Sequence, residues 1–106
     1  MAGEFRADVE PVVIEAEKAI LALVKETVPA AGLRRIGPVG ITAPSWSCWI
    51  VTPTDTERDK LASDAVLLEE LRCAGAKAGF APDSFTIQSQ ETVERDFEGS
   101  WFYAMR

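Results

Sequence analysis

Residues 54–106 read TDTERDKLASDAVLLEELRCAGAKAGFAPDSFTIQSQETVERDFEGSWFYAMR, and this stretch has the clearest organisation in the chain. Thr54 and Glu57 have the spacing of a capping box, which marks the start of a helix. Gly79 is the residue type that most often ends one. Apolar residues recur between them at helical spacing, at Leu61, Ala65, Leu68, Leu71 and Ala74 or Gly75. We therefore expect one amphipathic helix that begins at the Thr54 cap and ends at Gly79.

The chain after this helix predicts a hairpin. Residues 84–96 alternate apolar and polar side chains and predict a third strand, and residues 100–106 predict a fourth, aromatic one. A three-residue loop, Phe97-Glu98-Gly99, has the best turn chemistry and opposes Arg95 to Trp101. A two-residue loop, Glu98-Gly99, is the alternative, and it would turn the fourth strand over relative to the third.

The chain before Thr54 predicts one helix and two strands. Asp8 is a plausible N-cap, with Pro11 in the first helical turn, and an apolar stripe follows at Val13, Ala16, Ile20, Val24 and Val28. Residues 33–41 predict a strand that Gly37, Pro38 and Gly40 interrupt, as on a bulged or edge strand. Residues 46–52 predict a second strand, with Trp46, Cys48 and Ile50 on one face and Ser47, Trp49 and Val51 on the other.

The predicted order is therefore α-β-β-α-β-β in a single domain, residues 1–106. This order favours an α+β two-layer sandwich, in which both helices cover one face of a four-stranded antiparallel sheet. The other sheet face is free to meet solvent or a partner. Residues 1–7 are expected to form a loosely ordered leader, because Glu4-Phe5 is what an inserted cloning site can encode.

Composition excludes several functions. The net charge of −6 and the pI of about 4.6 disfavour nucleic-acid binding, and the apolar runs are too short to span a membrane. The chain has no histidine, which removes histidine-based triads and metal sites. Cys48 and Cys73 predict buried, inert thiols in a reducing cytoplasm, with a Cys48–Cys73 bridge as the minor alternative. We expect no cofactor, no metal and no catalytic residue.

The best candidate for a binding surface is the sheet face away from the helices. Trp49 and Phe102 are expected to project from it, and exposed aromatic residues ringed by polar side chains are typical of interface hot spots. The polar members of this predicted surface are Gln88, Gln90, Glu94 and Asp96. The alternative is that a homodimer partner or another layer covers the same aromatic residues.

A second candidate site lies between sheet and helices. Glu91 is expected to face the core side, where a carboxylate needs a partner such as Arg34, Arg35, Arg95 or Arg106. Its predicted pocket consists of Glu91, Tyr103, Trp46 and Arg95. This arrangement would suit a small molecule or a metal ion.

The leading functional hypothesis is a small acidic, non-enzymatic interaction domain of the inhibitor, immunity or adaptor type. It would bind a partner protein, with a basic protein as the partner that the charge favours, through the sheet face and the acidic hairpin. The alternative hypothesis is a domain that binds a small molecule or a metal in the pocket around Glu91. A third is a homodimer with a structural role.

Overall fold

The computed structural model describes residues 2–40 and 43–105, and it describes side chains from Val9 onward. Its elements in chain order are α1 (Ala2–Thr27), β1 (Gly32–Val39), β2 (Ser45–Thr52), α2 (Asp55–Ala62), α3 (Ala65–Ala78), β3 (Ser84–Ser89), α4 (Gln90–Asp96) and α5 (Trp101–Ala104). The predicted end of the first strand at Ile41 and the predicted Arg106 partner lie outside the described residues.

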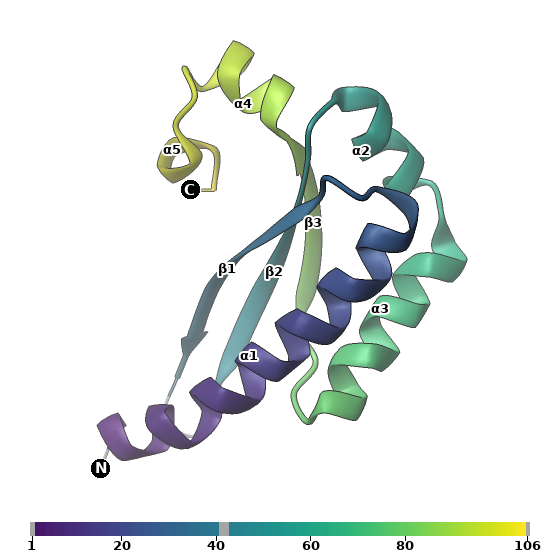
Figure 1. Cartoon of the computed structure of the whole chain (residues 1–106). Helices are drawn as coiled ribbons and strands as arrows, with labels where there is room; N and C mark the ends of the chain where they lie inside the picture. The colour runs from purple at the N-terminus through teal and green to yellow at the C-terminus, as the bar shows by residue number, and fades with distance from the viewer. Residues whose placement is uncertain (1, 41–42, 106) are drawn as a thin grey trace.

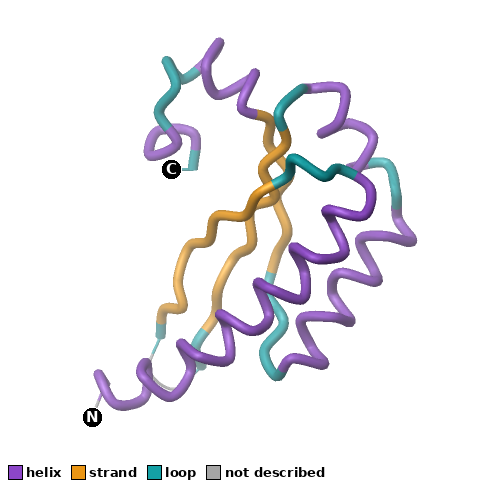
Figure 2. Tube along the Cα trace, viewed as in Figure 1, coloured by secondary structure: helices purple, strands orange, loops and turns teal. Residues whose placement is uncertain are grey.

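The described strands form one mixed sheet in the order β1-β2-β3. β1 and β2 form an antiparallel hairpin, whereas β3 runs parallel to β2. Parallel neighbours need a crossover connection, and α2 and α3 provide it. Figure 1 shows α1 and α3 side by side on one side of the sheet, and Figure 2 shows the strands as a separate layer beside them.

The predicted four-stranded antiparallel sheet is wrong. β3 ends at Ser89, because this residue caps a helix: its hydroxyl accepts a hydrogen bond from the Thr92 N–H at 3.0 Å. Ser100 caps α5 in the same way through the Tyr103 N–H. The predicted third strand therefore becomes a strand and a helix, and the described part of the fourth is helical. Neither predicted hairpin register exists, and Glu98 and Gly99 link two helices with positive φ angles.

The predicted alternation of β2 is confirmed. Trp46, Cys48, Ile50 and Thr52 are buried, while the residues between them are only half-buried. The apolar stripe of α1 meets this face and completes the core, with Val13, Ala16, Ile20, Val24 and Val28 all at least 99% buried. β1 is an edge strand with an irregularity between Ile36 and Val39, as predicted.

Both predicted helices differ from the structure, the first at its start and the second in its middle. α1 begins at Ala2, so Asp8 and Pro11 lie inside it and Asp8 is not its N-cap. The predicted second helix is two helices, since Asp64 starts α3 by accepting the Leu67 N–H at 3.0 Å. The Thr54–Glu57 capping box is confirmed, as is the left-handed C-terminal Gly79.

The two cysteines are free thiols in different surroundings. Cys48 is buried as predicted, and burial raises the pKa of its thiol to about 12, with a smaller contribution from the Glu17 carboxylate. Cys73 is exposed on α3, which contradicts the prediction of a buried thiol. Cys73 lies outside the buried stripe of α3, which runs through Leu67, Leu71 and Gly75, and it borders a surface hollow that Leu23 of α1 also lines.

Candidate functional site

The face of the sheet away from α1 and α3 carries the candidate site. The register pairs Arg34 with Trp49 and Ile36 with Ser47 on this outer face. The C-terminal segment returns over β1 on the same side, as Figure 1 shows for α5. The outer face is therefore covered only in part, by α5, in the portion of the chain that the structure describes.

A hollow lies where α5 meets β1, and we call it the outer groove. Its volume is about 440 Å³, and it is lined by Arg34, Ile36, Trp101, Phe102 and Met105. The exposed fractions of Ile36 and Phe102 are 42% and 70%, which is high for large apolar side chains. The outer groove is thus an apolar surface with one cation, Arg34, in its wall.

Trp101 forms the inner wall of the outer groove and is only 8% exposed. Its indole Nε1–H donates a hydrogen bond to Gln90 Oε1 at 2.8 Å. The Arg34 guanidinium carbon lies 5.0 Å from the centre of the indole ring, within the range of a cation–π interaction. These contacts attach α5 both to α4 and to β1.

The position of α4 depends in turn on a polar cluster at the carboxyl ends of β2 and β3. We call it the Asp55 network; its members are Asp55, Arg58, Ser89, Thr92 and Arg95. The Asp55 carboxylate accepts hydrogen bonds from the Ser89 hydroxyl, from Thr92 Oγ1 at 2.6 Å and from Arg95 Nη1 at 3.0 Å. Arg58 Nη1 donates to Thr92 Oγ1 at 2.8 Å. The network therefore joins the start of α2 to α4.

Glu91 adds a second link between the same two helices. Its Oε1 accepts a hydrogen bond from the backbone N–H of Asp55 at 2.9 Å, which satisfies a free donor in the first turn of α2. The side chain is exposed and does not face the core, because it lies on α4 and not on a strand. The predicted position of Glu91 on the core side is therefore wrong, and the hydrogen bond that its carboxylate accepts comes from a backbone N–H and not from one of the expected arginine side chains.

The chemistry of the Asp55 network favours a structural role. Hydrogen bonds from Ser89, Thr92 and Arg95 hold the pKa of the Asp55 carboxyl well below its usual range. A carboxylate so stabilised is a poor general base near neutral pH, since it gives up this stabilisation on accepting a proton. The network fixes α4, and through it Trp101, in place.

The structure distributes the predicted binding residues around the outer groove and α4. Phe102 lines the groove, Trp49 lies opposite Arg34 in the sheet, and Gln90 holds Trp101. Gln88 lies on β3, and its side-chain Oε1 accepts a hydrogen bond from Arg58 Nη1 at 3.2 Å. Glu94 and Asp96 are exposed on α4. Phe102 reaches this side from a helix and not from a strand.

The residues predicted for the alternative pocket lie at separate places. Glu91 and Arg95 both contact Asp55. Trp46 is buried at the opposite end of β2, where its Nε1–H donates to the Phe80 carbonyl at 3.0 Å. Tyr103 is 59% exposed on α5. The predicted pocket between sheet and helices is therefore not formed by these residues.

Sequence reasoning missed most of the groove lining. The sequence predicts Arg34 only as a partner for Glu91, and it places Trp101 and Met105 in the fourth strand. The sequence signal for the two C-terminal helices is the pair of serine caps, Ser89 and Ser100, each at the start of a short helix. The Ser100 cap competes with the strand preference of the aromatic residues that follow it.

The described residues contain no cluster of three or more acidic, cysteine or histidine side chains that could hold a metal ion. Within the same ranges, no helix has the length and apolar character needed to cross a membrane. No protein-family model matches the chain, and comparisons with curated proteins and with solved structures found no significant match.

Proposed function

We propose that the protein is a non-enzymatic interaction domain that binds a partner protein through the outer groove. The observation that carries this proposal is the hollow of about 440 Å³ with exposed Ile36 and Phe102, on a sheet face that the described residues cover only in part, through α5. Exposed apolar surface of this kind is typical of interaction sites. A partner would insert an apolar or aromatic side chain between Ile36 and Phe102.

The charges near the groove favour a basic partner. The chain has a net charge of −6, and α4 with the following loop exposes a set of carboxylates, Glu91, Glu94, Asp96 and Glu98. The nearby Arg34 is already engaged with Trp101, and Arg95 is paired with Asp55 and Asp96. Basic side chains flanking the inserted residue would meet these acids. Such complementarity speeds association more than it adds affinity.

Inhibitor, immunity and adaptor proteins all belong to this functional class. The two free thiols are compatible with a reducing cytoplasm as the place of action. The alternative, a small-molecule- or metal-binding domain, has weaker support. The one carboxylate of the Asp55 network, that of Asp55, already accepts hydrogen bonds from three side chains of the protein itself.

Selection from a displayed library of random peptides tests the proposal. Peptides selected on the wild-type protein should pair an aromatic residue with lysine or arginine, and their affinity should fall as salt rises. Phe102→Ala and Ile36→Asp should each weaken a selected peptide at least about tenfold in a calorimetric titration, as expected for hot-spot residues.

Val66→Asp is the matched control, because Val66 is 71% exposed on α3, away from the groove. This variant should bind the same peptides with unchanged affinity. If peptides selected on the protein bind the Phe102 and Ile36 variants as tightly as they bind the wild type, or if selection yields no binders, the outer groove is not the binding site.

A further inference from the structure

β1 carries two adjacent arginines that lie on opposite faces of the sheet. Arg35 is paired in register with the buried Cys48, so it belongs to the helix side. Its guanidinium forms ion pairs with Glu10 and Glu17 of α1. Arg34 lies on the outer face and lines the outer groove. The alternation of side chains along a strand therefore places one cation in the wall of this groove.

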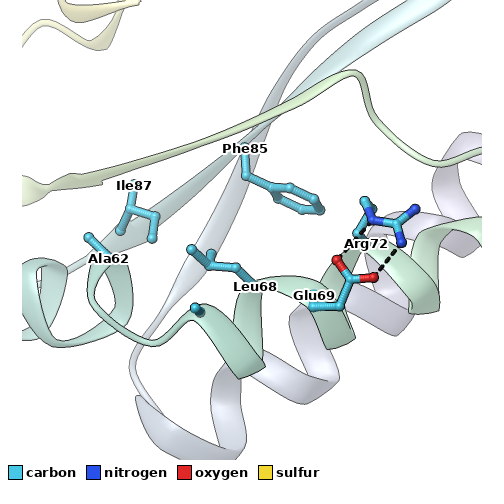
Figure 3. A pocket seen from close by; sticks show the side chains of 7 residues that line it. Ala62, Leu68, Glu69, Arg72, Phe85 and Ile87 are labelled. Carbon is cyan, nitrogen blue, oxygen red and sulfur yellow. Dashed lines mark hydrogen bonds and ion pairs between the residues drawn. The ribbon is translucent and has the colours of Figure 1, made fainter.

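Arg34 differs from the other described arginines in having no carboxylate partner. Acidic residues outnumber basic ones in the chain by 17 to 11. Figure 3 shows the usual outcome, an arginine of α3 that forms an ion pair with a glutamate one turn away. Within the described residues, the guanidinium of Arg34 makes no hydrogen bond and no ion pair. The arginines that do form ion pairs are Arg35, Arg58, Arg72 and Arg95.

The contact with Trp101 holds the Arg34 guanidinium without supplying a hydrogen-bond acceptor. The guanidinium carbon lies 5.0 Å from the centre of the indole ring. Attraction to the face of a ring requires no acceptor atom, so the N–H donors remain available to a ligand. Trp101 is itself fixed by the hydrogen bond to Gln90 at 2.8 Å. A cation held in this way loses less freedom when a ligand binds, and this favours binding.

We propose that the Arg34 guanidinium recognises a carboxylate of the partner protein, that of an aspartate or glutamate beside the aromatic residue that enters the outer groove. Because the site is the outer groove, this inference rests on the proposed function and specifies the chemistry of the partner. A planar guanidinium matches a carboxylate through two parallel N–H···O bonds. Ile36 and Phe102 provide the apolar contact next to it.

The charges of the chain restrict what can carry this carboxylate. The net charge of −6 repels a partner that is acidic overall, so the recognised acid belongs to a protein that is basic elsewhere. Phosphorylated residues are bound by clusters of arginines, whereas the described lining of the outer groove contains Arg34 alone. A single carboxylate is therefore the group that this site fits.

An NMR titration of the ¹⁵N-labelled protein tests the inference with a pair of probes of the same shape, 3-phenylpropionate and 3-phenylpropionamide. Both should shift the indole Nε1–H resonance of Trp101 and the backbone amides of Ile36 and Phe102. The carboxylate should bind about fivefold more tightly than the amide at low salt, as expected for an exposed ion pair. This preference should decrease as the salt concentration rises.

Variants of Arg34 show whether its charge causes the preference. Arg34→Gln should bring the affinities of the probes within about twofold of each other and leave the affinity for the amide as in the wild type. Loosening of Trp101 would instead weaken both probes, so this comparison separates recognition from a structural role. Arg34→Lys should keep part of the preference, because it retains the charge and loses the planar fork.

Lys18→Gln is the matched control for the loss of one positive charge. Lys18 is exposed on α1, on the helix side of the sheet, and its ion pair is with Glu15. This variant should keep the preference of the wild type for the carboxylate.

Peptide selection extends the test to the partner. Peptides selected on the wild type should carry an aspartate or glutamate at a fixed spacing from the aromatic residue, in addition to the basic residues that meet the acids of α4. Peptides selected on Arg34→Gln should lack this acid.

The inference is overturned if the carboxylate binds no more tightly than the amide, or if neither probe shifts a resonance of the groove. It is also overturned if Arg34→Gln keeps the preference or weakens both probes equally, if Lys18→Gln loses it, or if the selected peptides show no enrichment of an acid. The proposed function survives each of these results as long as selected peptides still require Phe102 and Ile36, so the two failures are distinguishable.

Discussion

Replacing Trp101 by alanine should remove the inner wall of the outer groove. Burial of a tryptophan takes about 150 to 250 Å² out of water, which corresponds to about 4 to 6 kcal/mol at about 25 cal/mol per Å². The hydrogen bond to Gln90 contributes about 1 kcal/mol more. Truncations of this kind in proteins cost about 3 to 5 kcal/mol. We place Trp101→Ala at the lower limit, because a C-terminal segment can detach without unfolding the core.

The predicted loss of about 3 kcal/mol corresponds to a fall in Tm of more than about 10 °C for a domain of this size. Phe102→Ala is the control: the neighbouring side chain is 70% exposed, and its loss should change the stability by less than about 0.5 kcal/mol. Denaturant unfolding compares the two variants, and hydrogen exchange at α4 and α5 should rise only in Trp101→Ala. Equal stabilities of the two variants would refute the assignment of Trp101 as the anchor of the C-terminal segment.

Two further predictions concern titratable groups. Asp55 has a folded-state pKa below its unfolded value of about 3.9, so its contribution to stability is present above that pH and is lost as the pH falls. Below about pH 4, the Tm of Asp55→Asn should therefore decline less steeply than the Tm of the wild type. Parallel curves of Tm against pH would contradict this prediction. Iodoacetamide should alkylate exposed Cys73 in the native protein, and it should alkylate buried Cys48 only after unfolding. Peptide mass spectrometry measures the labelling of each cysteine. Equal labelling of both in the native protein would contradict the burial of Cys48.

The parts of the fold that the sequence predicted are those in which local pattern and tertiary packing agree. β2 alternates strictly, and its apolar members enter the core. The stripe on α1 and the Thr54–Glu57 capping box likewise stand in the structure as their spacing predicts. In each case, one periodicity fits the residues and no competing motif interrupts it.

The prediction for the C-terminal third was wrong because strand alternation and helix capping disagree there. Residues 84–96 alternate well enough for a strand, yet Ser89 stops the strand by capping α4 and binding Asp55. The aromatic run after Ser100 has strand propensity, but the docking of Trp101 onto Gln90 and Arg34 favours a helical turn. Tertiary contacts from distant residues overrode propensity in both places, and no local window contains them.

The parallel pairing of β2 and β3 has a different origin. Because residues 90–96 and 101–104 are helical, β3 has no hairpin partner after it and pairs with an earlier strand. The long connection through α2 and α3 allows a parallel crossover, which places Thr52 beside Ser89 at one end of the sheet. That juxtaposition brings the start of α2 against α4 and creates the Asp55 network. The Asp55 network is therefore a consequence of the sheet topology, and it could not be predicted from the sequence alone.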